Sequence, residues 1–105
     1  MLDTLAQVLK TIPNDLRIEG HTDNVPIATA RFPSNWHLSV IRALNTGYYI
    51  ISKHKLNPEK ISVVGYSEYR PLFPNDTEEH RARNRRVDIV IITSLAHEQQ
   101  AENKH

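Results

Sequence analysis

The chain of 105 residues contains no cysteine, so neither a disulfide framework nor a thiolate metal site is available to it. It also lacks an excess of charge of one sign, because 13 basic residues stand against 12 acidic ones and the formal net charge is +1. Such a balance gives no overall attraction to nucleic acid or to an anionic membrane. Any basic surface that meets a partner must therefore be local.

Long hydrophobic runs are absent as well. No stretch approaches the roughly 20 apolar residues of a membrane-spanning helix, and no signal peptide comes before the first periodic segment. A hydrophobic share of 39% and a charged share of 24% are typical of a soluble globular domain with one modest core. Because the chain enters a helical pattern almost at once, we expect it to be a piece of a longer protein.

Apolar periodicity predicts helices and strands in alternation, and no internal repeat is visible. The first helix ends where Pro13 restricts the residue before it, and Ser34 or Asn35 is the expected N-cap of the main helix. The last strand is apolar on both faces, which favours a central place in the sheet. The predicted segments are helices over residues 2–12, about 38–54 and about 75–83, and strands over residues 16–20, 61–65 and 87–92.

This order predicts an α+β fold, namely a two-layer α/β sandwich in which the two long helices cover one face of a small mixed sheet. Gly47 costs about 1 kcal/mol relative to alanine inside the main helix, so we expect the helix backbone to lie close to the sheet there. The connection over residues 25–36 is long, and long loops are often functional. We predict one domain over residues 1–95 and a disordered polar tail over residues 96–105.

The first candidate site lies where the 16–20 strand ends in consecutive polar side chains. Asp23 could simply close an Asx-type turn. It is also expected at the same end of the sheet as Arg42, near the start of the main helix. The two side chains either form a structural ion pair or flank a cleft for a ligand that carries an ammonium and a carboxylate. Free helix amides near Leu38 and Ser39 would add to the carboxylate side of such a cleft.

The second candidate is the basic cluster formed by Arg81, Arg83, Arg85 and Arg86. It could bind phosphate groups of a nucleic acid. It could equally be a solvated helix end that nearby acidic residues balance. No aromatic residues are interleaved with the arginines, which favours the solvated helix end.

None of the six histidines has the spacing of a metal site, so no metal or cofactor is predicted. His21 and Asp23 could share one face of a strand, but such a contact is more often a structural pair than a catalytic one. Ser39 and Ser67 lack the pattern of a nucleophile elbow. The sequence therefore predicts no enzyme, although a hydrolase that uses His21 and Asp23 is the alternative to test.

Five short motifs resemble, in order along the chain, the OmpA-like peptidoglycan-binding domain. Each motif alone is weak, whereas five with fitting gaps are specific, and they extend over nearly all of the predicted fold. The motifs are G-H-T-D at 20–23, N-x-x-L-S-x-x-R-A at 35–43, G-x-x-E-x-x-P at 65–71, Asn75, and R-x-x-N-R-R-V-D-I at 81–89.

Within that family, residues 23–27 (D-N-V-P-I) and 32–36 (F-P-S-N-W) resemble the flagellar stator subunit MotB and its sodium-driven relatives. The resemblance implies non-catalytic peptidoglycan binding that anchors the stator to the cell wall. It also implies a periplasmic location, tethering by an N-terminal transmembrane helix, a MotA-type partner and a homodimer. A wall-anchoring domain of a lipoprotein or outer-membrane protein is the alternative. The family's first strand is missing from this sequence, which would leave a sheet edge open.

The resemblance also implies roles for individual residues. Asp23 matches the aspartate that binds the ammonium of diaminopimelate in the peptide stem, and Arg42 matches the arginine that binds its carboxylate. Thr22 lies beside that aspartate, and Leu38 and Ser39 match the helix start that borders the pocket. Further matches at or near the site, which could instead brace the loops, are Asn35, Arg81 and Arg85.

Two positions depart from the family pattern. His37 stands where an acidic or polar residue usually precedes Leu-Ser, and Ser67 stands where the Gly-x-Gly-Glu turn has its second glycine. We therefore expect the turn after the 61–65 strand to differ in shape.

Overall fold

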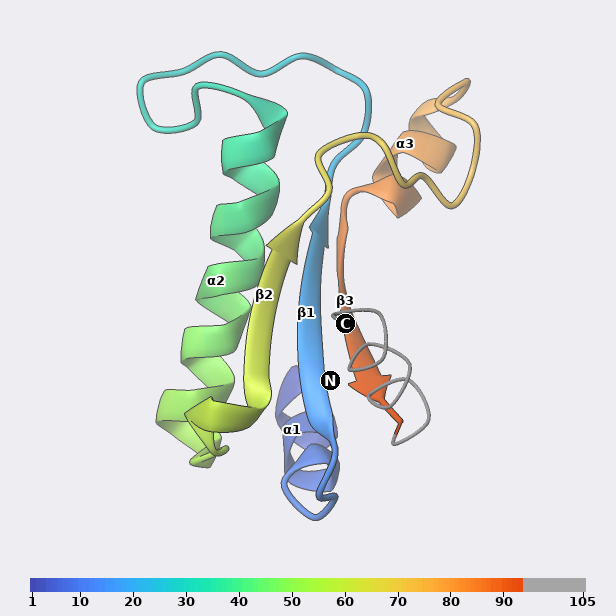
Figure 1. The fold of residues 1–105 in the computed structure, drawn as a ribbon. Helices are drawn as coiled ribbons and strands as arrows, with labels where there is room; N and C mark the ends of the chain where they lie inside the picture. Colours follow the sequence, from blue (N-terminus) through green and yellow to red (C-terminus); the bar gives the residue numbers. More distant parts are fainter. Residues whose placement is uncertain (94–105) are drawn as a thin grey trace, which may run out of the picture.

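The computed structural model describes residues 1–93, in which all the predicted helices and strands are present (Figure 1). None of the described helices combines the length and apolar character needed to cross a lipid bilayer. The predicted end of the domain at residue 95 and the predicted disordered tail lie outside the described residues. The elements are α1 (Leu2–Leu9), β1 (Asp15–His21), α2 (Asn35–His54), the 3₁₀ turn η1 (Pro58–Lys60), β2 (Ile61–Gly65), α3 (Glu78–Asn84) and β3 (Arg86–Ile92).

The strands form a mixed sheet in the order β2-β1-β3, in which β1 pairs with β2 in parallel and with β3 antiparallel. The mixed sheet was predicted, but the central place of β3 is wrong, because β1 is central and β3 lies at an edge of the described sheet. The second face of β3 carries two apolar residues, Val90 and Ile92. They share that face with Arg86 and Asp88, and Val90 lies opposite Arg17 of β1. This face is therefore too polar to be a buried layer.

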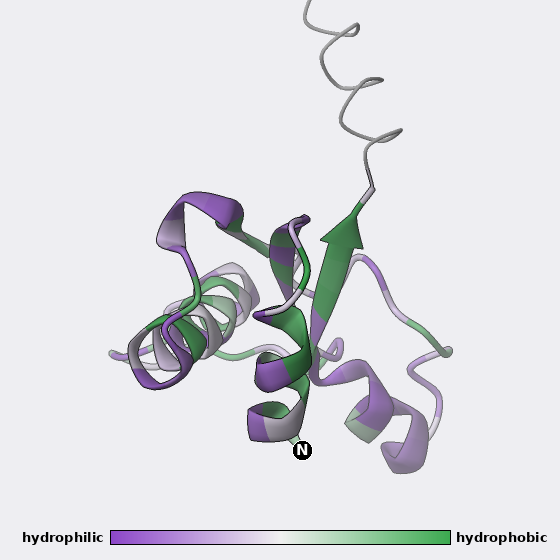
Figure 2. Ribbon diagram, turned by 90° about the horizontal axis from the view of Figure 1, so that it is seen from below, coloured by the Kyte–Doolittle hydropathy of each residue, from purple (hydrophilic) through white to green (hydrophobic). Residues whose placement is uncertain are grey.

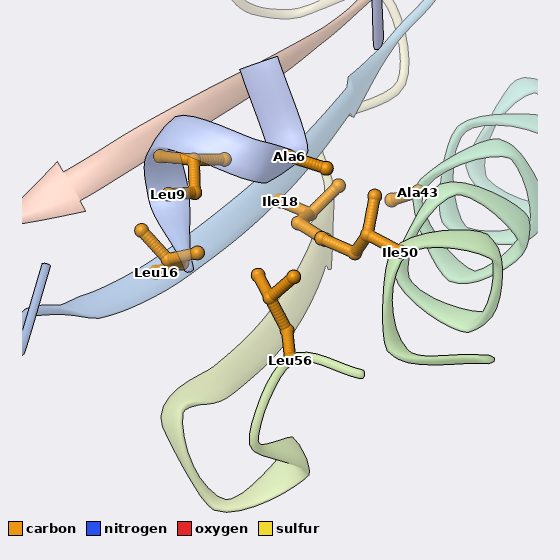
Figure 3. Packing of buried hydrophobic residues seen from close by; sticks show 7 residues of the cluster. All are labelled: Ala6, Leu9, Leu16, Ile18, Ala43, Ile50 and Leu56. Carbon is orange, nitrogen blue, oxygen red and sulfur yellow. The ribbon is translucent and has the colours of Figure 1, made fainter. Parts of the chain in front are cut away.

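The hydrophobic core lies between one face of the sheet and the two helices α1 and α2 (Figure 3). Alternation along β1 directs Leu16 and Ile18 to this face, where both side chains are buried. Figure 2 shows hydrophobic stretches along α1 and α2, while α3 is hydrophilic along most of its length. The predicted two-layer sandwich is confirmed. The buried core residues are Ala6, Leu9, Leu16, Ile18, Ala43, Ile50 and Leu56.

Glycines allow α2 to approach the sheet closely. A Cβ atom on Gly47 would lie 3.4 Å from side chains of both β1 and β2, which confirms the predicted approach at this residue. The approach is closer still near the start of α2. A Cβ on Gly20 would lie 1.9 Å from the backbone oxygen of Ser39, and one on Gly65 would lie 2.4 Å from Cγ2 of Val40. The end of β1 and the first turns of α2 are thus held in one fixed arrangement.

Two helices begin at other residues than the periodicity predicted. Helix α2 begins at Asn35, because Ser34 caps it and accepts a 3.3 Å hydrogen bond from the amide of His37. This confirms Ser34 as the N-cap, and the helix begins about three residues earlier in the chain than predicted. Helix α3 begins later than predicted, at Glu78, with the side chain of Thr77 as its cap.

Polar contacts join α1 to the far end of α2. The carboxylate of Asp3 accepts a 2.5 Å hydrogen bond from the hydroxyl of Tyr49 and lies 2.8 Å from Nε2 of His54. Lys53 lies 3.4 Å from the same carboxylate. The hydrogen bond from Tyr49, followed by that from His54, holds the pKa of Asp3 well below its usual range. Asp3 therefore stays ionised and keeps the two helices together at the edge of the core.

Candidate functional site

The candidate site lies at the end of the sheet where β1 and β2 finish. Figure 1 shows that the start of α2, the long loop before it, and α3 are all at this end, at the top of the view. Parallel strands direct their carboxyl ends to the same edge, which is a common place for binding groups. The predicted site residues carried by these elements are Thr22, Asp23, Asn35, Leu38, Ser39, Arg42, Arg81 and Arg85.

Asp23 is 6% exposed and is held by two partners. Its Oδ1 accepts a 3.0 Å hydrogen bond from the amide of Val25, so the predicted Asx-type turn is present. Its Oδ2 accepts a 2.6 Å hydrogen bond from Nη1 of Arg85, which also donates from Nη2 to Glu78 at 2.8 Å. Glu78 first, and then Asp23, raise the pKa of Arg85. The structural partner of Asp23 is thus Arg85, and the ion pair with Arg42 is not formed.

Arg42 lies half-buried in the second turn of α2. Its guanidinium makes no hydrogen bond or ion pair with any other residue in the described range 1–93. Helical spacing puts it on the same stripe as Tyr49, which reaches Asp3 of α1, but two turns nearer to the start of the helix. Arg42 therefore lies on the α1 side of α2, toward the end of the sheet where Asp23 is held, with its charge available to a ligand.

Ser39 and Leu38 do not supply free helix amides. Because α2 already begins at Asn35, the amide of Leu38 donates to the carbonyl of Ser34 at 3.1 Å. Ser39 is fully buried, and its hydroxyl donates to the carbonyl of Trp36 and accepts from the amide of Ser67. The prediction of free amides at this position is therefore wrong. Ser39 instead ties α2 to the loop that follows β2.

Thr22 and Asn35 brace the backbone on either side of Asp23. The amide of Thr22 donates to the carbonyl of Ser67 at 2.9 Å, and its hydroxyl donates to the carbonyl of Asp23. The side-chain amide of Asn35 donates to the carbonyl of Val25 at 3.1 Å. Both side chains are buried, so they position the Asp23 turn and do not extend toward solvent.

The two departures from the family pattern both make local contacts. Ser67 has a left-handed backbone with φ of 56°, a conformation that glycine adopts with least strain. His37 lies with Nδ1 2.7 Å from the hydroxyl of Ser34, at the cap of α2. The turn at Ser67 is nevertheless well anchored, since its amide and its carbonyl both bond to neighbouring segments.

Each arginine of the basic cluster has an acidic partner. Besides the pairs of Arg85, Arg81 lies 3.3 Å from Glu78, Arg83 lies 3.8 Å from Glu79, and Arg86 lies 3.0 Å from Asp88. Arg81 also donates to the carbonyl of Asn75 at 3.5 Å, so it braces the loop before α3. These contacts support the solvated helix end over a phosphate-binding surface.

Asn84 is fully buried and was not among the predicted site residues. Its Oδ1 accepts from the amides of Leu72 and Phe73, and its Nδ2 donates to the carbonyl of Phe73 and to Oδ1 of Asn75. The loop between β2 and α3 is therefore built around this one amide. The only sequence signal was its place inside the R-x-x-N-R-R motif.

The predicted contact between His21 and Asp23 is not formed, neither as a structural pair nor as a catalytic one. The ring of His21 is 2% exposed and Nε2 lies 3.4 Å from Oδ2 of Asp88 and 3.6 Å from Oε1 of Glu19. Neither ring nitrogen has a hydrogen-bond partner within residues 1–93. Burial is the main cause that lowers the pKa of His21, and the charge of Arg86 adds to it. The lowered pKa favours the neutral imidazole. Because Nε2 is directed at Asp88 and Glu19 while the carboxylate of Asp23 is held by Val25 and Arg85, the two side chains are not placed to act together.

Comparison with known proteins agrees with this architecture. A model of the OmpA family matches residues 1–85. Motility protein B of Bacillus subtilis is 48% identical over 80 residues, which cover 76% of this chain and 31% of that protein. The chain spans about a third of the length of such curated relatives.

Solved structures show the same fold. The cell wall anchor of the T6SS from Pseudomonas aeruginosa superposes with a TM-score of 0.81 and 35% identity, over 89% of this chain and 64% of that one. The C-terminal domain of Helicobacter pylori MotB superposes with a TM-score of 0.78 and 25% identity, over 99% of this chain and 82% of that one. The α+β fold and the resemblance that the motifs indicated are both confirmed, and the chain belongs to the OmpA family.

Proposed function

We propose that this domain binds peptidoglycan without catalysing a reaction on it and anchors a flagellar motor stator to the cell wall. Membership of the OmpA family and the similarity to Motility protein B and to a cell wall anchor support this function. The observation that carries it is a pair of opposite charges at one end of the fold. Asp23 is a rigidly held acid, and Arg42 is a base without a partner among the described residues.

Asp23 can still accept a ligand. An ionised carboxylate offers about four acceptor positions, and the described contacts of Asp23 use two of them. Because Val25 and Arg85 fix the orientation of the carboxylate, an ammonium group that binds there does not have to order it first. Asp23 is therefore suited to the ammonium of a zwitterionic ligand such as diaminopimelate in a peptide stem.

Arg42 supplies the complementary contact. A guanidinium binds a carboxylate through two parallel hydrogen bonds, which are stronger than bonds between neutral groups. Fully exposed ion pairs contribute only about 0.2–1 kcal/mol each, and hydrogen bonds to charged groups about 1.5–3 kcal/mol. Two such contacts at the buried Asp23 and the half-buried Arg42 give only a weak affinity for a single stem peptide. Firm anchoring then comes from several domains on one polymeric wall, by effective concentration.

The proposal extends to a longer protein that carries this domain, as Motility protein B of Bacillus subtilis does. There the domain would lie on the outer side of the cell membrane, tethered by a transmembrane helix, beside a MotA-type subunit and a second copy of itself. In that arrangement the wall holds the stator still while ion flow through the membrane part generates torque on the rotor.

Co-sedimentation with purified sacculi tests the function and the site together. The wild type should sediment with the wall, and Asp23→Ala and Arg42→Ala should each weaken binding at least roughly tenfold while the circular dichroism spectrum is unchanged. Arg83→Ala is the matched control, because this arginine is exposed and only weakly paired. A wild type that stays in solution would contradict the function. Two variants that sediment like the wild type would contradict the site.

A further inference from the structure

The face of the sheet turned away from the helices carries a compact group of ligand-type side chains. Glu19 of β1 lies directly opposite Asp88 of β3, and His21 lies two residues further along β1, on the same face. Like charges directly opposite each other in a sheet are destabilising. Two carboxylates in this register therefore need positive charge nearby, and Arg17 and Arg86 supply it in the structure.

The two distances from His21 to the carboxylates fit ligands of one metal ion. One oxygen of Glu19, Nε2 of His21 and one oxygen of Asp88 all lie within 4.8 Å of one another. Nε2 is 3.4 Å from the oxygen of Asp88 and 3.6 Å from that of Glu19. Zinc bonds of about 2.0–2.2 Å in a tetrahedron put neighbouring ligand atoms about 3.3–3.6 Å apart. We propose that Glu19, His21 and Asp88 form a Zn²⁺ site, with water as the fourth ligand.

His21 is prepared as a ligand. It is 2% exposed, and its Nε2 points at the two carboxylates without a hydrogen bond to any described residue. A buried polar atom without a partner is costly, and a metal bond would satisfy it. The ring stacks on Tyr66, with centroids 5.3 Å apart and planes within 17°, which fixes its orientation.

Two arginines currently balance the acids. Arg17 donates from Nε to Oε2 of Glu19 at 2.7 Å, which leaves Oε1 as the oxygen nearer to His21. Arg86 donates from Nε to both oxygens of Asp88, at 3.0 and 3.1 Å. Outer contacts of this kind orient ligating carboxylates, but their charge opposes a cation. Affinity for zinc is therefore expected to be moderate and to rise when one arginine is neutralised. The site does not depend on the proposed wall binding.

Calorimetric titration of the full chain with ZnCl₂ alone, in a buffer that does not chelate metals, tests the site. Asp88→Asn and His21→Ala should each weaken the binding at least roughly tenfold. Arg17→Gln should strengthen it, because Glu19 then has only the metal to neutralise it. The control is His37→Ala, which removes an exposed histidine at the cap of α2 and should leave the affinity unchanged.

A second measurement protects the test against a variant that fails to fold. In the wild type, zinc should shift the ring resonances of His21 at one equivalent, as read by histidine side-chain NMR. The proposal is overturned if these resonances do not move or if zinc produces no heat. It is also overturned if Asp88→Asn binds zinc like the wild type. The side chain of Asp88 is 39% exposed, so this substitution should not prevent folding.

Discussion

Nη1 of Arg85 lies 2.6 Å from Oδ2 of Asp23 and joins the start of β3 to the end of β1. The side chain of Asp23 is 9% exposed and that of Arg85 is 36% exposed, so the pair joins a buried acid to a partly exposed base. Asp23 is thus oriented by a residue far away in the sequence, and Arg42 keeps its charge for a ligand.

Removing Arg85 should loosen the site more than removing a neighbouring arginine. Arg85→Met leaves the buried carboxylate of Asp23 and the acid Glu78 without their shared partner. We expect Tm to fall by several degrees, as measured by circular dichroism at low salt. Arg83→Met is the control, because the ion pair of Arg83 with Glu79 is 3.8 Å long and exposed. Equal values of Tm for the two variants would show that the Asp23–Arg85 pair does not hold the site together.

Gly20→Ala should be among the most damaging single substitutions in the domain. Its new Cβ would lie 1.9 Å from the backbone oxygen of Ser39, so α2 would have to move away from the sheet. Overpacking against backbone should cost about 3 kcal/mol in the free energy of unfolding, as measured with urea. Gly47→Ala is the comparison, since its contacts of 3.4 Å are tolerable and alanine favours a helix by about 1 kcal/mol. A neutral Gly20→Ala would refute the close approach.

Stability should fall when the pH drops below the ordinary pKa of histidine, about 6.5. Burial lowers the pKa of His21 in the folded state, so the unfolded chain takes up a proton before the folded one does. The stabilising effect is therefore complete above about pH 6.5 and is lost as the pH falls toward the folded pKa. Urea unfolding at pH 7.5 and 5.5 should show this loss in the wild type and a smaller one in His21→Asn. His37→Asn should keep the slope of the wild type; if His21→Asn keeps it too, His21 is not the group responsible.

Ser67→Gly should stabilise the domain. Serine at φ of 56° bears a steric cost of about 1 kcal/mol that glycine does not, partly offset by the greater freedom of glycine in the unfolded chain. We expect a gain of a few tenths to about 1 kcal/mol in urea unfolding. Ser67→Ala keeps the Cβ and should give no gain. A loss of stability in Ser67→Gly would mean that the serine side chain has a role of its own in this turn.

The sequence predicted local structure well because local structure depends on local patterns. Apolar period and turn residues were sufficient to predict α1, α2, α3, the strands β1 to β3 and the close approach at Gly47, and they narrowed the cap to Ser34 or Asn35. They did not predict η1, and α1 ends at Leu9 and not at the predicted residue 12. The place of β3 was predicted wrongly, because apolar residues on both faces do not reveal which strand pairs on which side. Val90 and Ile92 are apolar, but their face of the sheet is otherwise polar.

The partners within the site could not be predicted for a related reason. Spacing suggested Arg42 for Asp23, whereas the contact with Arg85 depends on how the α3–β3 junction folds back against the end of β1. The cluster of Glu19, His21 and Asp88 was invisible for the same reason, since the antiparallel register of β1 and β3 creates it. Tertiary contacts between strands distant in sequence carry no short-range signal.

The most direct test of the central claim compares two stem peptides that differ by one group. A peptide with meso-diaminopimelate carries the ammonium and the carboxylate, and the same peptide with lysine lacks that carboxylate. NMR titration should show that the wild type prefers the diaminopimelate peptide roughly tenfold, that Arg42→Ala loses this preference, and that Asp23→Ala weakens both peptides. Equal affinity of the wild type for the two peptides, or a preference that survives in Arg42→Ala, would contradict the account.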